Sequence, residues 1–478
     1  MPTPEFRARL ILLDRRNRPS RIHRLAATGL GLLMLAAAPA WGIDDPESLG
    51  PWKVGHRETN VLSPPHLPTG ARVFFDIWYP VDTVDWVGEF TSYLLSDVVF
   101  TVLEIDSTVA KRDVDVSSTG GFPLVVFSHG SGSVPVQSIV MVETLVSHGF
   151  IVIAPTHYRN NFFDTVSQPF LVTARQRPKD ISYSIDYLFA RNLDTLDDFF
   201  GSIDESRVGV TGHSFGGFTA LALASGYTNA FCDTQVDSDY GDACVDDGDC
   251  LSTCSTATVA SDTRVKVIMP VSPAHNILSD AELESVGLPT LCMAGTAESL
   301  STQCIRPFPL TQVTPSPNFR ADVIGAAHEA FANICDFGNA LIDAGICPSS
   351  SDPPPCDPNP PTDPADYDIW VSIGAGALVQ PFLDVCVLAL IDVAEVNRLQ
   401  NLYTVSFFRR YLLGETGYDP FLTIEYGNSE PNVNFFAGVL STPVLSAAGL
   451  VLLGGLLAGT AVWRTRRLRP LTPGSHPS

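Results

Sequence analysis

The chain has 478 residues, with 29 lysines and arginines against 52 aspartates and glutamates, which gives a formal net charge of −23. A chain this acidic argues against nucleic acid or anionic phosphate as its partner. The length leaves the number of domains open, because a single α/β domain can exceed about 250 residues.

The N-terminal segment, residues 1–41, has the layout of a secretory signal peptide. Seven arginines precede the short apolar run "LAATGLGLLMLAAAPAWG", in which Ala38 and Ala40 supply the small residues expected at a cleavage site. An uncleaved membrane anchor is the alternative. Because export leads to an oxidising compartment, the even number of ten cysteines predicts disulfides rather than metal ligands.

From Ala71 onward, short apolar runs alternate with longer amphipathic segments, a pattern typical of a mostly parallel sheet with helices on both faces. Several runs are apolar throughout, as expected for strands buried on both sides. The predicted strands are 72–80, 122–130, 150–155, 207–212, 265–272, 288–295 and 320–325. The predicted helices are 135–148, 176–191, 214–225 and a long helix near 382–412.

Two stretches interrupt this alternation and are predicted insertions in an α/β domain that spans residues 42–430. Residues 226–263 hold four cysteines and an acidic run, and residues 345–366 are too rich in proline for a regular element. Aspartates of the first insertion could ligate calcium, which prefers oxygen ligands; a solvated acidic loop is the alternative. These aspartates are Asp237, Asp239, Asp242 and Asp246.

The C-terminal end predicts attachment to a membrane. A linker, residues 431–442, leads into residues 443–463, which contain no charge and are long enough to cross a bilayer as a helix. Arginines in the tail, residues 464–478, then mark the cytoplasmic side and leave the main body outside. A buried core helix is one alternative. The order of Pro-containing motif, apolar span and basic end also resembles bacterial sorting signals, which would make protein-sorting machinery a partner.

The stretch "RVGVTGHSFGGF", residues 207–218, carries the first chemical signal. It places Ser214 between glycines, directly after a predicted strand and before a predicted helix. A Gly-x-Ser-x-Gly sequence arises easily by chance, but a sharp turn from strand to helix would expose the serine hydroxyl at the edge of the sheet. We therefore predict that Ser214 is a nucleophile, which needs a base to take its proton.

The base and the acid are predicted from chain order. In this kind of turn the order is serine, acid and then histidine, which excludes the histidines before Ser214. His328 follows the last predicted strand, and small residues before it would let the imidazole reach the serine. Glu298, just after the strand 288–295, is the favoured acid and would hold the histidine in one tautomer. Asp280 stays as the alternative acid, because it follows the preceding strand.

Two backbone N–H groups are expected to stabilise the negative charge that develops on a carbonyl oxygen. Phe215, directly after the nucleophile, supplies one of them. The other is predicted at Ser131 in "SHGSGS", which follows the strand 122–130. Glycines on both sides of Ser131 give the backbone the freedom to turn inward.

The motifs together resemble a known enzyme group. The stretches "VVFSHGSG", "GHSFGG", "AGTAE", "GAAHEAF" and "FFRRYLLGETGYDPFL" look like the α/β-hydrolases that include platelet-activating-factor acetylhydrolases, chlorophyllase-like enzymes and bacterial predicted dienelactone hydrolases. The resemblance covers residues 70 to 425 approximately and implies an α/β-hydrolase fold and a serine carboxylic-ester hydrolase without metal or organic cofactor.

The resemblance also implies roles for single residues. Ser214 would be the nucleophile, His328 the base, and Ser131 and Phe215 the oxyanion donors. Glutamate stands where aspartate is commoner in the group, so the acid at Glu298 departs from the pattern. Dienelactone hydrolases use a cysteine at the position of Ser214, so their substrate is not implied.

These observations predict an exported, membrane-tethered serine hydrolase. It would cleave carboxylic esters of short to medium acyl chains, lipid esters among them, through an acyl-serine intermediate. Two alternatives stay open: a catalytically silent hydrolase fold that serves as a surface binding module, and an amidase or polyester hydrolase that uses the same triad.

Overall fold

The computed structural model describes residues 43–98, 101–162, 164, 170–228, 258–314, 316–352, 354–357, 359–372 and 376–438. The chain divides into two compact units, Met1–Gly42 and Ile43–Ser478. The predicted signal peptide, most of the first insertion with its four aspartates, the C-terminal apolar segment and the basic tail all lie outside the described residues. Among the helices that are described, none combines the length and the apolar character that a membrane crossing requires.

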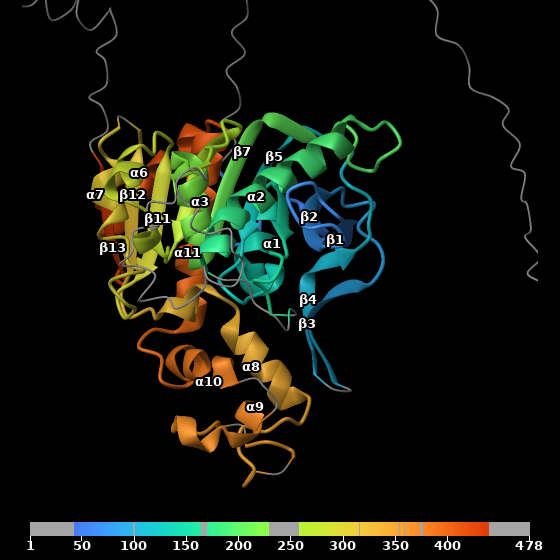
Figure 1. The fold of residues 1–478 in the computed structure, drawn as a ribbon, viewed down its shortest axis with the longest axis vertical. Helices are drawn as coiled ribbons and strands as arrows, with labels where there is room; N and C mark the ends of the chain where they lie inside the picture. Colours follow the sequence, from blue (N-terminus) through green and yellow to red (C-terminus); the bar gives the residue numbers. More distant parts are fainter. Residues whose placement is uncertain are drawn as a thin grey trace, which may run out of the picture. The chain divides into compact units, whose positions relative to one another are not determined.

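The second unit is built on an eleven-stranded sheet in the order β13-β12-β11-β10-β7-β5-β6-β2-β1-β4-β3 (Figure 1). From β12 to β6 neighbouring strands run parallel, whereas β13 and β2 flank this part antiparallel. The strands are β1 (Lys53–Leu62), β2 (Arg72–Val81), β3 (Phe90–Val98), β4 (Thr101–Arg112), β5 (Phe122–Ser128), β6 (Ile151–Pro155), β7 (Ile203–His213), β10 (Val265–Val271), β11 (Thr290–Gly295), β12 (Asn318–Val323) and β13 (Val433–Ala437). A separate pair joins β8 (Tyr227–Thr228) to β9 (Thr258–Val259).

Helices cover both faces of this sheet, because its inner strands are apolar on both sides. Along β5, Val125 and Phe127 face one core, and Leu124 and Val126 face the other. The helices α1 and α11 pack in the first core, and α2, α3 and α6 in the second. The helices are α1 (Ile139–Ser147), α2 (Phe170–Leu193), α3 (Phe215–Ser225), α6 (Asp280–Glu284), α7 (Pro307–Thr311), α8 (Ile334–Asp343), α9 (Asp368–Ser372), α10 (Gly376–Phe382), α11 (Val393–Leu412) and α12 (Ile424–Gly427).

Between β12 and α11 the chain forms a helical insertion, residues 334–387, which is larger than the predicted 345–366. Its helices α8, α9 and α10 lie together outside the layers of the sheet in Figure 1. Trp370 is fully buried, with its ring 5.1 Å from that of Tyr367 and 5.2 Å from that of Phe382. Two disulfides, Cys335–Cys386 and Cys347–Cys356, hold the insertion, so aromatic packing and cross-links stabilise it together.

The sheet and helices differ from the sequence prediction in several places. Residues 433–437, assigned to the linker 431–442, form β13, because alternate apolar side chains there pack against β12. The helix predicted near 382–412 is broken: a π-helical turn occupies Leu383–Val387, and Asp392 caps a new helix, α11. The strands β1, β3 and β4 were not predicted. All seven predicted strands are confirmed, as β2, β5, β6, β7, β10, β11 and β12.

Candidate active site

Ser214 occupies the turn between the end of β7 and the start of α3. Its φ of 57° and ψ of −115° lie in a region that residues other than glycine rarely adopt, so the turn is strained. A Cβ atom on Gly216 would lie 1.8 Å from the carbonyl oxygen of Ser128, and one on Gly212 would lie 2.5 Å from the same atom. Both positions need glycine because the end of β5 passes too close for any side chain.

A continuous chain of hydrogen bonds starts at the Ser214 hydroxyl. Its Oγ lies 2.9 Å from Nε2 of His328, and Nδ1 of His328 lies 2.7 Å from Oε2 of Glu298. The three side chains follow β7, β12 and β11, whose parallel course brings their carboxyl ends to one edge of the sheet. A carboxylate can only accept, so Nδ1 of His328 donates and Nε2 is left to accept the serine proton.

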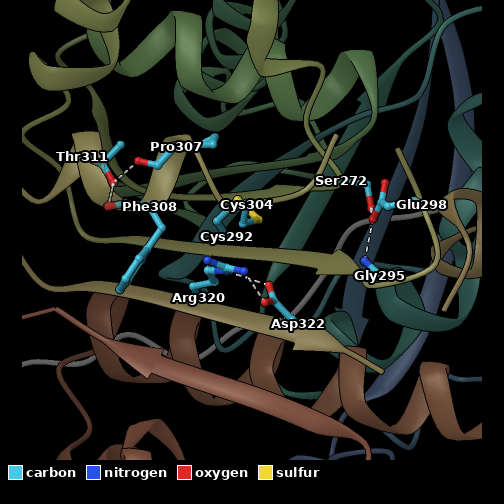
Figure 2. Close-up of a disulfide and its surroundings, with 10 residues drawn as sticks. All are labelled: Ser272, Cys292, Gly295, Glu298, Cys304, Pro307, Phe308, Thr311, Arg320 and Asp322. Carbon is cyan, nitrogen blue, oxygen red and sulfur yellow. Dashed lines mark hydrogen bonds and ion pairs between the residues drawn. A yellow bond between two sulfur atoms is a disulfide. The ribbon is translucent and has the colours of Figure 1, made fainter. Parts of the chain in front are cut away.

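Glu298 is held on its other side as well. Its Oε1 accepts hydrogen bonds from the Ser272 hydroxyl at 2.8 Å and from the Gly295 N–H at 2.5 Å, and its side chain is fully buried (Figure 2). The disulfide Cys292–Cys304 closes the loop that contains Glu298. Three hydrogen bonds and a covalent loop therefore fix the carboxylate against His328.

The ionisation of the pair follows from these contacts. Burial, the largest single effect, raises the pKa of Glu298, but the hydrogen bond and charge of His328, together with hydrogen bonds from Thr302 and the Gly295 N–H, outweigh it and hold the pKa below its ordinary value of 4.5. Burial lowers the pKa of His328, yet its hydrogen bond to Glu298 and the nearby charge of Glu329 raise that pKa above 6.5. Both shifts favour a protonated His328 beside an ionised Glu298, which is the state reached when the histidine takes a proton.

The alternative acid, Asp280, lies in a different environment. It is the first residue of α6, its side chain is 69% exposed, and it pairs with Arg306 at 2.8 Å. The structure thus brings Glu298, and not Asp280, to His328.

The loop after β5 and the turn at Ser214 are tied together by one buried amide. Oε1 of Gln137 accepts from the Gly130 N–H at 2.7 Å, and Nε2 of Gln137 donates to Nδ1 of His213 at 2.5 Å. Nε2 of His213 in turn donates to the carbonyl of His328 at 2.8 Å. Burial, followed by the charge of His328, lowers the pKa of His213 to about 3, so it stays neutral. This relay fixes the loop of Ser131 relative to the serine and the histidine.

His213, His328 and Glu329 lie close enough together to be considered as a metal site. Their nitrogens, however, already have partners: both of His328 are used by the chain from Ser214 to Glu298, and both of His213 by the relay through Gln137. A metal ion would have to break these hydrogen bonds. The arrangement is therefore suited to proton transfer.

The family model of chlorophyllase matches residues 113–238. This family lies in the α/β-hydrolase superfamily and cleaves esters, which agrees with the resemblance drawn from the motifs and with the mostly parallel sheet. The matched segment includes Ser131, Ser214 and Phe215 but ends before Glu298 and His328.

Some residues of the site were not predicted. Ser272, Gln137 and the buried Arg177 carry no motif of their own, and their contacts depend on how distant segments pack. His213 did have a signal, because it directly precedes Ser214 in the motif.

Proposed function

We propose that the protein is a serine hydrolase that cleaves carboxylic esters through an acyl-Ser214 intermediate. The observation that carries the proposal is the unbroken hydrogen-bond chain from Ser214 through His328 to Glu298, built at a strained turn from strand to helix. The chlorophyllase match supports an ester as the class of substrate.

The chemistry follows from the contacts. His328 accepts the Ser214 proton while Oγ attacks the ester carbonyl, and Glu298 stabilises the imidazolium that forms. The carbonyl oxygen becomes negative and receives hydrogen bonds from the N–H groups of Ser131 and Phe215. His328 then gives its proton to the departing alcohol. In the second half a water molecule, deprotonated by His328, attacks the acyl-serine, and the acid leaves as Ser214 recovers its proton.

A hollow beside the Ser131 loop bears on the size of the substrate. It has a volume of about 250 Å³ and lies next to Val134, Pro135 and Val136. Its lining combines apolar residues such as Phe74 and Leu94 with four charged residues, Glu58, Arg72, Asp76 and Asp164. Ser214, His328 and Glu298 do not line this hollow, and we propose that the acyl chain extends into it from the serine. A space of this size holds a short or medium chain, since drug-sized sites begin at about 300 Å³. We therefore propose that the acyl group is short to medium.

We further propose that the enzyme is exported and tethered to a membrane. The support is the character of residues 1–41 and 443–463, together with the three disulfides found among the described residues, since disulfides form and persist in oxidising compartments. An enzyme with this role would have no nucleic-acid partner and so would not need a basic surface.

The test is a Ser214→Ala variant assayed on nitrophenyl esters from acetyl to dodecanoyl. We expect turnover to fall by at least about 10³-fold on every ester, with the wild type fastest on the shorter chains. Ser206→Ala, at an exposed position of β7, is the matched control and should keep full activity. Equal turnover by the wild type and Ser214→Ala would refute the proposal.

A further inference from the structure

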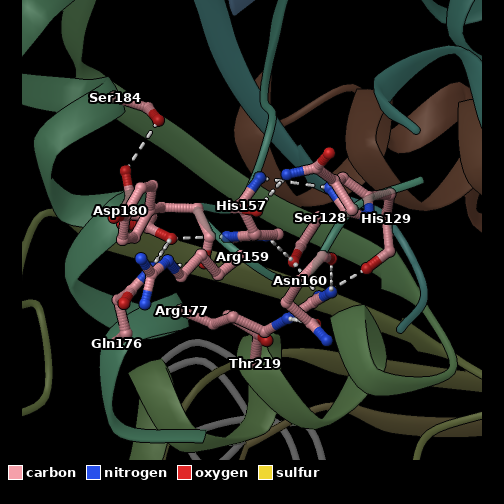
Figure 3. Close-up of polar contacts among 12 residues, drawn as sticks. Ser128, His129, His157, Arg159, Asn160, Gln176, Arg177, Asp180, Ser184 and Thr219 are labelled. Carbon is pink, nitrogen blue, oxygen red and sulfur yellow. Dashed lines mark hydrogen bonds and ion pairs between the residues drawn. The ribbon is translucent and has the colours of Figure 1, made fainter. Parts of the chain in front are cut away.

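A buried arginine that takes no part in the mechanism above lies under the Ser131 loop. Arg177 of α2 is fully buried, and its guanidinium donates to two successive backbone carbonyls. Figure 3 shows it with His129 and Asn160. Nη1 lies 2.5 Å from the oxygen of His129, and Nη2 lies 2.8 Å from the oxygen of Gly130. Nε donates to the Asn160 side chain at 2.8 Å. The rigid guanidinium of Arg177 thus fixes the backbone of His129 and Gly130.

Burying this cation costs free energy, and a second buried group, of opposite charge, offsets part of that cost. Burial lowers the pKa of Arg177 to about 9, and the charge of Asp180 opposes that shift. Asp180 is itself fully buried and accepts hydrogen bonds from His157 and His66, each at 2.7 Å. Buried charges are costly to keep, so we expect Arg177 and Asp180 to have a role beside Ser214.

The direction of the Gly130 carbonyl determines the direction of the next N–H. Gly130–Ser131 is a trans peptide, so the carbonyl oxygen of Gly130 and the N–H of Ser131 point in opposite directions within one plane. Arg177 holds the oxygen, which turns the Ser131 N–H away from the guanidinium. The preceding N–H, that of Gly130, is already bonded to Gln137. Within the described residues the Ser131 N–H has no such partner, so it is left for a ligand.

We propose that Arg177 is a positioning residue that aims the Ser131 N–H at the oxyanion and strengthens it as a donor. A cation on the carbonyl side of an amide polarises the whole group, so its N–H becomes a better donor. Asn160 assists, because its side chain accepts from Arg177 and donates to the Ser131 hydroxyl at 3.1 Å. This inference rests on the proposed ester hydrolysis, in which Ser131 supplies an oxyanion donor.

The experiment compares a nitrophenyl ester with its thiono analogue, in which sulfur replaces the carbonyl oxygen. Sulfur is a weak acceptor, so the thiono reaction depends little on the oxyanion donors. In Arg177→Lys, one ammonium cannot reach both carbonyls, and we expect kcat on the oxygen ester to fall about 10- to 100-fold with KM within about twofold. The ratio of the two kcat/KM values, oxygen over thiono ester, should fall by a similar factor.

Asn160→Ala is the milder variant, because this residue is only half-buried. In Asn160→Ala we expect the ratio of kcat/KM for the oxygen ester to that for the thiono ester to fall about threefold or more. This is less than the loss expected when a whole oxyanion donor is removed. Arg191→Lys is the matched control on the same helix: Arg191 lies over the ring of Phe199, as Arg177 lies over that of Phe215, and it pairs with Asp197. It should leave the ratio unchanged.

A merely structural role would slow both esters equally and leave the ratio at its wild-type value, which would overturn the inference. If Arg177→Lys does not fold, the ratio in Asn160→Ala decides in the same way. If instead the proposed ester hydrolysis is wrong, the wild type itself would turn over neither ester and would not react with a fluorophosphonate. The two failures can therefore be told apart.

Discussion

Replacing Glu298 with glutamine tests whether Glu298 sets the tautomer of His328. Oε1 of Glu298 accepts from the Ser272 hydroxyl and from the Gly295 N–H. A backbone N–H can only donate, so the amide oxygen of a glutamine would stay on that side and its NH2 group would face Nδ1 of His328. Nδ1 would then have to accept, and the ring proton would move to Nε2. There it blocks transfer from Ser214, which lies 2.9 Å away.

The size of the effect follows from this tautomer change. The corresponding change in a Ser-His-Asp triad lowers kcat by about 10⁴-fold, or roughly 5.5 kcal/mol at about 1.4 kcal/mol per decade. We expect a loss of that order for Glu298→Gln, measured as kcat on a nitrophenyl ester, with circular dichroism to show that the variant is folded. Asp280→Asn is the control and should stay within about twofold, because Asp280 lies at the surface beside Arg306.

Two results would contradict this reasoning. A folded Glu298→Gln that keeps more than about a tenth of wild-type kcat would mean that the glutamate does not set the tautomer. A large loss in Asp280→Asn instead would move the role of the acid to the other carboxylate.

Three further predictions concern pH, packing and the disulfides. The kcat/KM for esters should rise with pH through a single step above 6.5, because His328 must be neutral to act as a base and its pKa is raised; a midpoint below 6.5 would contradict this. Gly216→Ala should lower the free energy of unfolding by at least about 1–3 kcal/mol in denaturant titrations, whereas Gly287→Ala, whose new Cβ would meet only the Ser285 carbonyl oxygen at 4.0 Å, should change it little. Cys304→Ala and Cys356→Ala should each cost up to about 3 kcal/mol of stability in thermal melts, but only the first, which frees the loop of the acid, should also lower kcat.

The inner strands could be predicted because their physical environment is uniform. In β6 and β11, for example, every residue is buried, and such strands appear in the sequence as continuous apolar runs. The outer strand β1 is half-exposed along most of its length and mixes charged with apolar residues, so no apolar run marks it. The helical insertion could not be delimited either, because its core depends on aromatic residues that are far apart in the sequence.

The residues of the candidate site are likewise of two kinds, those that a local sequence pattern predicts and those whose contacts depend on the fold. Ser214, Glu298 and His328 each follow a parallel strand, and chain order limits where the acid and the histidine can be, so a local pattern was enough. The choice between Glu298 and Asp280 depends on where two loops fold, and the sequence could only rank them. Arg177 sits in the middle of a helix, and nothing near it in sequence indicates that it reaches the backbone of Gly130.

The most direct measurement is labelling of the folded wild-type protein with a fluorophosphonate, followed by mass spectrometry of its peptides. This reaction needs the nucleophile, the base and the oxyanion donors at once. We predict one label per chain, on the peptide that contains Ser214, and none after thermal unfolding or in Ser214→Ala. Absence of label from folded protein, or a label on a different serine, would contradict the proposed serine hydrolase.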